Sequence, residues 1–216
     1  MTTSHDHDDS GDVAHSDVPS RILAAAARCF YRDGIWATGV DALAAEAGVS
    51  KRTLYNHFGS KDSVIAAYLR QREDQWQAKL EALWDEVGDD PVERVVAHVH
   101  AYARPVEPER FRGSAFINAA AELADDGGEA LAVIQHSLDR MQSGLAALLG
   151  QAGYEQPEAL ALRVLYLLEG AVVVGGARRD ADVLDDAEQM IRELLDQHAP
   201  SRASAAARRP RTASGR

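Results

Sequence analysis

Apolar residues recur every three or four positions along most of this chain, the spacing that gathers them on one face of an α-helix. The pattern begins at Ser20, which can cap a first helix, and Gly34 ends that helix. A second, short helix is predicted from Val40 to Ala47, and a third from Ser50 to about Phe58, with Gly48 between them. The apolar positions of the first helix are Leu23, Ala26, Ala27 and Phe30.

The helical pattern continues beyond Ser60, where a long fourth helix is expected to begin. Asp90 and Pro91 then form a second start signal, because Asp caps a helix and Pro fits its first turn. Residues 104–113 are a Pro-containing break, and no segment shows the strict alternation of a β-strand between hairpin turns. The sequence therefore predicts an all-α fold, with later helices over about 91–102, 115–123, 130–149, 157–177 and 182–197.

Both ends of the chain lack this periodicity. Residues 1–18 are polar and acidic, and residues 199–216 consist mainly of Ala, Ser, Arg and Pro, so both are predicted to be disordered tails. His5 and His7 could bind a metal ion weakly, and the basic C-terminal tail could contact phosphates, but we interpret both segments as solvated tails. Between the tails we predict an N-terminal domain over 19–65 and a larger domain over 66–198.

Composition excludes several classes of protein. With 46% apolar and 26% charged residues among 216, the chain has the balance of an ordinary globular protein. The single cysteine, Cys29, excludes an intramolecular disulfide; we interpret it as a reduced core thiol, with a redox sensor as the alternative. No apolar run nears the roughly 20 residues that span a bilayer, and the polar N-terminus is unlike a secretory signal, so we expect a cytoplasmic protein without a membrane partner.

The net charge of −11 argues against a protein that coats nucleic acid non-specifically. Its distribution is uneven, however. Residues 20–65 carry six basic and four acidic residues, whereas residues 66–201 carry 12 basic and 25 acidic residues. One predicted domain is therefore positive while the rest of the folded chain is acidic.

Residues 38–58 read as a helix-turn-helix, two short helices joined by a tight turn that contains glycine. Gly48 suits a sharp turn, and Val49 and Leu54 can bury the inner face of the pair. Hydrogen-bond donors and amphipathic rings then occupy the outer face, where a helix in the major groove contacts phosphates and base edges. An ordinary solvated helix is the alternative. The outer residues are Lys51, Arg52, Thr53, Tyr55, Asn56 and His57.

The stretch RILAAAARCFYRDGIWATGVDALAAEAGVSKRTLYNHFGSKDSVIAAYL, residues 21–69, resembles the N-terminal domain of the tetracycline-repressor (TetR/AcrR) family without a gap. A shorter stretch, residues 111–122, is similar to a segment that opens a helix of the regulatory domain in one subgroup. The matching positions of the first stretch are the Ile22–Ala26 start, Phe30, Gly34, Thr38, Val40, Ala44, Gly48–Ser50, Thr53–Tyr55, His57, Phe58, Lys61 and Asp62.

This resemblance implies roles for individual residues. Thr38 and Lys61 would bind phosphates, Tyr55 and His57 would brace the DNA backbone, and Asn56 could read an adenine. Lys51, Arg52 and Thr53 on the recognition helix would face bases or nearby phosphates. Gly39 departs from the hydroxyl residue common in the family, and Arg52 replaces a small residue, so the operator preference is expected to be this protein's own.

The resemblance also implies a homodimer and an effector. The two last helices, about 157–177 and 182–197, would pair with those of a second copy, so that two reading heads meet half-sites about 34 Å apart or a multiple of it. Gly170, Gly175 and Gly176 would let backbones approach there. The helices over about 90–153 would enclose an effector pocket, although each candidate residue is more often plain core. The candidates are Trp84, Tyr102, Phe116, Asn118, His136, Met141 and Tyr166.

The function implied is a sequence-specific transcription regulator, by family default a repressor, that a small-molecule effector releases from a palindromic operator. We expect the effector to act by moving the long fourth helix. An enzyme is disfavoured, because no phosphate loop, nucleophile elbow or metal-ligand cluster occurs, and no cofactor is expected. A helical scaffold that never binds DNA remains the other alternative.

Overall fold

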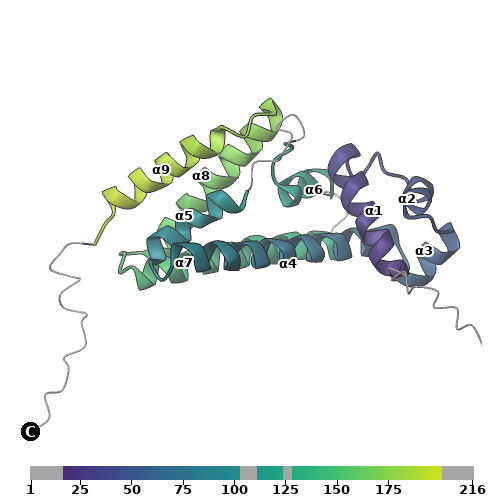
Figure 1. Cartoon of the computed structure of the whole chain (residues 1–216), viewed down its shortest axis with the longest axis horizontal. Coiled ribbons are helices and arrows are strands. Elements are labelled where there is room, and N and C mark those ends of the chain that lie inside the picture. Colours follow the sequence, from purple (N-terminus) through teal and green to yellow (C-terminus); the bar gives the residue numbers. More distant parts are fainter. Residues whose placement is uncertain (1–16, 103–110, 124–127, 201–216) are drawn as a thin grey trace, which may run out of the picture.

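The computed structural model describes residues 17–102, 111–123 and 128–200, and these form helices joined by turns, without a strand. The all-α prediction is therefore confirmed for the described part of the chain. The molecule is elongated, with α1, α2 and α3 at one end and α8 and α9 toward the other (Figure 1). The N-terminal tail up to residue 16 and the C-terminal tail from residue 201, with His5 and His7, lie outside the described residues.

The first three helices are α1 (Val18–Asp33), α2 (Val40–Ala47) and α3 (Lys51–Phe58). Helix α1 begins two residues before the predicted start, and Ser20 is not its cap. The reason is Pro19, which fits a first helical turn because the N–H that it lacks would have no intrahelical partner there. Helices α2 and α3 have the predicted bounds, with Ser50 as the cap of α3.

Helix α4 (Lys61–Val87) has 27 residues and is therefore about 40 Å long at 1.5 Å per residue. It runs beside α7 (Glu129–Gln151) and carries the chain from the α1–α3 end to the far end of the molecule (Figure 1). There α5 (Pro91–Ala101) packs against it. The Asp90 side chain caps α5 by accepting a hydrogen bond from the Val92 N–H at 2.8 Å, as the sequence predicted.

The buried apolar residues form two cores. The first joins α1–α3 and the start of α4 to α6 (Ala115–Leu123) and the start of α7. The second is built by α5, the end of α7, α8 (Pro157–Arg178) and α9 (Val183–Gln197). The first core thus extends beyond the N-terminal segment, because the side chains of Ala119, Leu123, Ala130, Val133 and Ile134 complete it.

Helix α8 corrects one expectation. Among the described residues it is the one helix whose length and composition would suffice to cross a membrane, whereas the sequence was taken to contain no such stretch. A core helix of a soluble protein can have the same length and composition. Helix α8 packs between α7 and α9 and contributes Leu160, Val164, Leu168 and Val172 to the second core, which accounts for its apolar character.

Candidate DNA interface and effector cavity

The turn between α2 and α3 is built by local sequence. Gly48 adopts the left-handed conformation, with φ of 65°, and its N–H donates to the carbonyls of Ala44 and Ala45. The Ser50 side chain then accepts from the Thr53 N–H at 3.0 Å and so fixes the first turn of α3. These two residues set the angle at which α3 leaves α2.

Arg21 of α1 holds the same turn from the other side. Its guanidinium donates to the carbonyls of Ala47 and Gly48, each at 2.7 Å. These carbonyls end α2, where a cation is favoured both by the free acceptors and by the helix dipole. Sequence reasoning missed this role, because 26 residues separate Arg21 from its first partner.

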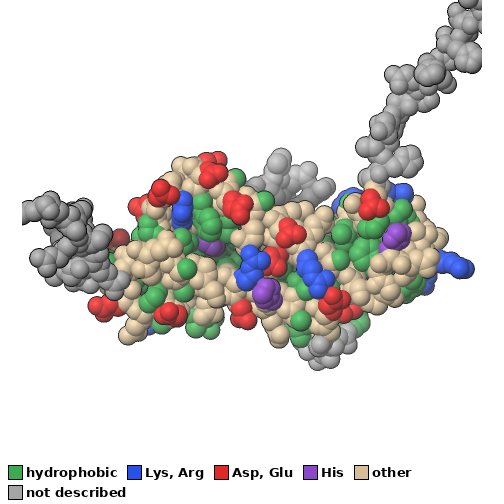
Figure 2. Space-filling model, turned by 90° about the horizontal axis from the view of Figure 1, so that it is seen from below, with side chains coloured by type: hydrophobic (Ala, Val, Ile, Leu, Met, Phe, Trp, Pro, Cys, Tyr) green, Lys and Arg blue, Asp and Glu red, His purple; other side chains and the backbone are tan. Residues whose placement is uncertain are grey.

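The outer face of α3 is solvent-exposed. Leu54 points into the first core and is 0% exposed, whereas Lys51, Arg52, Tyr55, Asn56 and His57 are exposed and Thr53 is half-buried. Figure 2 shows Lys and Arg side chains at this end of the molecule and also near its middle, with Asp and Glu side chains spread over the whole of that face. The face therefore offers free donors to a polyanion.

Lys51 makes the one ion pair of this face among the described residues. Its ammonium lies 3.1 Å from the Asp41 carboxylate of α2, and both side chains are well exposed. An exposed ion pair contributes little free energy, so a phosphate can replace Asp41 as the partner of Lys51.

Thr38 and Lys61 lie beside α3 but differ from it. Thr38 is 4% exposed, and its hydroxyl donates to the Gly34 carbonyl at 2.7 Å. The Lys61 ammonium donates to the Ile35 carbonyl at 2.6 Å, and partial burial lowers its pKa. Both side chains hold the loop between α1 and α2.

Among the described residues, hydrogen bonds of Arg112, Glu122 and Asp62 connect this end of the molecule to the remainder. Arg112 donates to the carbonyls of Tyr31 and Arg32 at the end of α1. The Glu122 carboxylate accepts from the Trp36 N–H at 2.7 Å. The Asp62 carboxylate accepts from the Glu129 N–H at 3.0 Å, at the start of α7. The α1–α3 end is therefore attached at α6 and α7 as well as through α4.

A cavity of about 1240 Å³ lies between α1, α4, the end of α5, α7, α8 and residues 111–116. Of the seven candidate pocket residues, Tyr102, Phe116 and Met141 lie in its wall. The other four do not. The Trp84 indole donates to the Arg94 carbonyl, the Asn118 amide donates to the Arg112 carbonyl, His136 is exposed, and Tyr166 is 66% exposed.

Most of the wall residues were not among the candidates. Trp76 and Glu169 are the two of these that matter most for ligand binding. The rings of Trp76 and Tyr102 lie 4.6 Å apart between centroids. The Tyr102 hydroxyl donates to Glu169 Oε1 at 2.6 Å. A carboxylate in the middle of the apolar sequence of α8 was the available signal for Glu169, because such a residue needs a specific environment.

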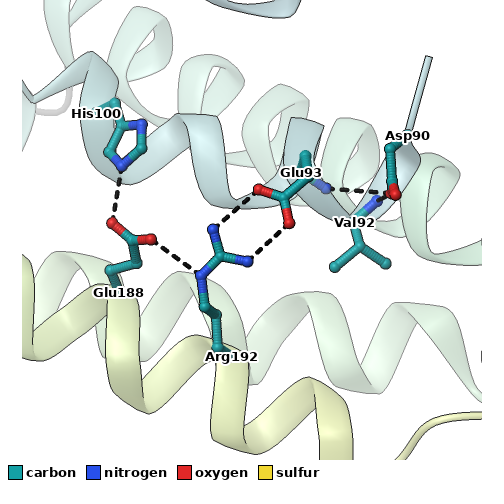
Figure 3. A network of polar contacts seen from close by, with 6 residues as sticks. All are labelled: Asp90, Val92, Glu93, His100, Glu188 and Arg192. Atoms are coloured by element: carbon teal, nitrogen blue, oxygen red, sulfur yellow. Dashed lines mark hydrogen bonds and ion pairs between the residues drawn. The ribbon is translucent and has the colours of Figure 1, made fainter. Parts of the chain in front are cut away.

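A polar network joins α5 to α9 (Figure 3). Both terminal nitrogens of Arg192 donate to the Glu93 carboxylate, at 2.8 and 2.9 Å, and its Nε donates to Glu188. The other Glu188 oxygen lies 2.8 Å from His100 Nε2. Hydrogen bonds from Arg192 lower the pKa of Glu93, and those from His100 and Arg192 lower that of Glu188. The network fixes α9 against α5.

Helices α8 and α9 also carry exposed apolar side chains. Tyr166, Val173 and Val174 of α8 and Met190 of α9 are each at least 41% exposed. The glycines of α8 differ in their surroundings. A Cβ at Gly175 or Gly176 would meet Phe111 or Arg112 of the same chain, whereas Gly170 faces open space. The close approach at Gly175 and Gly176 is therefore within the subunit.

Comparison with known proteins agrees with this geometry. Residues 22–68 match the family model of bacterial regulatory proteins of the tetR family, and residues 91–190 match the C-terminal domain of LmrA/YxaF-like transcriptional regulators. The HTH-type transcriptional regulator HbdR of Aromatoleum sp. (strain CIB) is 30% identical over 90 residues, a match that spans 42% of this chain and 39% of that protein.

Solved structures extend the likeness to most of the chain. The TetR-family transcriptional regulator SCO4454 of Streptomyces coelicolor is similar with a TM-score of 0.77 and 28% identity, covering 85% of this chain and 96% of that one. The TetR-type regulator sav143 of Streptomyces avermitilis gives a TM-score of 0.74 and 29% identity, covering 85% and 98%. Together with the helix-turn-helix and the helical C-terminal domain, these matches establish that the chain belongs to the TetR family of bacterial transcriptional regulators, which are DNA-binding proteins and not enzymes.

Proposed function

We propose that this regulator is a cytoplasmic repressor that binds a palindromic operator as a homodimer and leaves it when a small molecule enters the cavity. The observation that carries the proposal is the outer face of α3, which presents exposed donors. On the opposite face of the helix, the buried Leu54 side chain anchors α3 in the core. A helix with this arrangement can enter the major groove without losing its packing.

The proposed DNA contacts follow the exposure of each side chain. Arg52 and Asn56 are exposed and make no hydrogen bond to another described residue, so they are proposed to read bases, together with Thr53. Lys51, Tyr55 and His57 are proposed to contact the phosphate backbone. Thr38 and Lys61 would act mainly by positioning the start of α2, whose N–H groups can bind a phosphate.

The proposed dimer interface is the exposed apolar face of α8 and α9. Tyr166, Val173, Val174 and Met190 would be buried against the same residues of a second copy, since a two-fold interface uses one patch twice. Burying such side chains stabilises association by roughly 25 cal/mol per Å² of apolar area. The dimer would place two α3 helices on half-sites about 34 Å apart or a multiple of it.

The proposed release mechanism is a shift between two conformations. An effector that binds one of them better moves the population toward it, and with it the separation of the two α3 helices. Helix α4 is one proposed connection, because it runs from the first core into the second. The segment 111–123 is another, because Arg112 contacts α1 and neighbouring residues line the cavity.

The test is binding of the purified protein to the DNA upstream of its own gene, at two salt concentrations, with random duplex as competitor. We expect specific binding that weakens as salt rises, and loss of it in Lys51→Ala and Tyr55→Ala. Arg178→Ala removes a basic side chain on α8 and serves as the control. A reporter gene behind the operator then distinguishes repression from activation.

If neither this DNA nor a genome-wide selection yields a specific site, the chain would instead be a helical scaffold with a helix-turn-helix fold. If binding occurs but Arg52→Ala and Asn56→Ala leave the sequence preference unchanged, the proposed base contacts would be wrong while the function stands.

A further inference from the structure

Glu169 is a carboxylate in the wall of the cavity whose hydrogen bonding is incomplete. Its Oε1 accepts the Tyr102 hydroxyl at 2.6 Å. Its Oε2 is buried and makes no hydrogen bond of ordinary geometry to a described residue, although the Ser114 hydroxyl lies close enough to lower the pKa of the carboxyl. A buried acceptor without a well-formed hydrogen bond costs free energy, and a donor on a ligand in the cavity would supply that bond.

Burial acts on both members of this pair. It raises the pKa of the Glu169 carboxyl, and burial together with the Glu169 charge raises the pKa of the Tyr102 hydroxyl well above its ordinary value. Tyr102 therefore stays a donor to Oε1 at any physiological pH. The oxygen that remains for a ligand is Oε2.

Aromatic rings share the cavity wall with this carboxylate. Trp76 of α4 and Tyr102 are in ring contact, at 4.6 Å between centroids. Phe111 and Phe116 complete the apolar part of the wall. Ring faces attract cations through their quadrupole, and the attraction grows where water is excluded. A wall that combines aromatic rings with a carboxylate whose hydrogen bonding is incomplete therefore favours a ligand with an aromatic body and a cationic donor.

The cavity wall also contains basic residues, which would favour an anionic ligand. Arg28 and Arg32 are paired with Glu46 and Asp33, and Arg112 is bound to carbonyls of α1. These cations are already neutralised or engaged. They therefore add little attraction for an anionic ligand.

Arg72, Lys79 and Arg179 also line the cavity and have no acidic partner among the described residues. Arg72 and Arg179 are solvent-exposed and therefore screened, whereas Lys79 is half-buried. Of these residues, Lys79 would therefore attract an anionic ligand most strongly, and a Lys79 variant tests this alternative.

We propose that the cavity binds an arylalkylamine, whose ammonium group donates to Glu169 Oε2 and lies against the rings of Trp76 and Tyr102. This rests on the proposed function only in treating the bound molecule as an effector. The binding site itself stands on the cavity, the free carboxylate oxygen and the rings. The amine would supply the partner that Oε2 lacks in the empty protein.

The test uses three probes with one skeleton, 4-(1-naphthyl)butylamine, the matching alcohol and the matching carboxylic acid, titrated calorimetrically into the full-length protein at neutral pH. We expect the amine to bind at least tenfold more tightly than the alcohol, and the acid most weakly. In Glu169→Gln the preference for the amine over the alcohol should disappear, while affinity for the alcohol stays within about twofold. The amide still accepts from Tyr102, so the fold is expected to persist.

Two further variants keep the test specific. Glu81→Gln removes an exposed acid of α4 outside the cavity wall and should leave the amine preference unchanged; an equal loss there would show only attraction to an acidic surface. Tyr102→Phe frees Oε1 as well as Oε2, so the amine should still bind more tightly than the alcohol. Loss of the preference in Tyr102→Phe would contradict the role of the carboxylate.

Two results would overturn the proposal. If the acid binds most tightly and Lys79→Met abolishes that binding, the cavity takes anions, and the proposed repressor function would survive without the amine. If the amine shows no binding up to about 1 mM, the site does not exist as described. A separate measurement of operator release by the amine distinguishes the two proposals, because the amine can bind without releasing DNA.

Discussion

The outer face of α3 and the cavity differ in how their residues are assembled. The proposed DNA contacts on α3 come from one eight-residue helix, whose side chains need only a fixed turn and one buried anchor. The cavity draws on α1, α4, the end of α5, α7, α8 and residues 111–116. A surface made by one helix moves as a unit, whereas a wall made by six segments changes when any of them shifts. The difference suits a rigid reading head attached to a responsive body.

Leu54→Ala should have the largest effect. Removing this fully buried side chain is expected to lower the free energy of unfolding by about 2–5 kcal/mol and to abolish operator binding. Because α6 and α7 share the first core, urea denaturation should still show one transition for the whole chain. A separate early transition would show that the α1–α3 end unfolds independently; Leu168→Ala in the second core is the matched comparison.

Acid should act mainly on the far end of the molecule, through His98. Its imidazole is 3% exposed, and burial lowers its pKa to about 4. The unfolded chain then binds a proton more readily than the native protein does, so stability is fully present above about pH 6.5 and falls as the pH falls toward 4. We expect a loss of roughly 2–3 kcal/mol by pH 4 relative to His98→Leu.

Urea denaturation of both proteins between pH 7 and pH 4 measures this difference. A wild-type and a His98→Leu curve that stay parallel over that range would contradict it. His136→Leu, which removes an exposed histidine, should follow the wild-type curve.

Gly176→Ala should disturb the contact between α8 and the cavity wall. The new Cβ would lie 2.7 Å from the Arg112 carbonyl oxygen and 2.8 Å from the Gly113 nitrogen, both backbone atoms that cannot rotate away. We expect a loss of about 1–3 kcal/mol. Gly144→Ala, in helix α7 with open space around it, should be neutral or stabilise the chain by up to about 1 kcal/mol. Equal melting temperatures of the two variants would contradict the close contact of Gly176 with the backbone of Arg112 and Gly113.

Arg112→Met should have the smallest effect on stability, about 1 kcal/mol, and should sharpen the comparison between the two ends. The variant loses the donors to the Tyr31 and Arg32 carbonyls. Amide hydrogen exchange should therefore accelerate around the end of α1 and stay unchanged in α9. Acceleration in both places would mean that Arg112 supports the whole fold and not the junction.

How well each helix could be predicted from the sequence depends on how near in the chain the residues that define it lie. The bounds of α2 and α3 follow from Gly48 and Ser50, whose effects reach three or four residues, and the sequence predicted both helices. Helix α1 starts at Val18, inside the segment predicted to be a tail, because Pro19 fits its first turn. The role of Arg21 depends on a partner 26 residues away, which no pattern in the sequence identifies.

The cavity shows the same limit more clearly. The sequence analysis chose aromatic pocket residues by residue type. Tyr102 does lie in the cavity wall, but Tyr166 does not, because its ring faces outward. Which face of a helix meets a cavity depends on packing against segments far apart in the chain. Trp76 and Glu169 therefore emerged only from the fold, although a charged residue inside an apolar helix marks a position worth testing.

The shared first core limits how regulators of this kind can be recombined. A chimaera that transplants only residues 19–65 onto another regulator would separate Phe30 and Ile35 from Ala119, with which they share the first core here. It would also separate Trp36 from Glu122 and Asp62 from the Glu129 N–H. A biosensor built by exchanging DNA-reading heads would need matching residues in α6 and at the start of α7, so the exchangeable unit is three stretches of sequence.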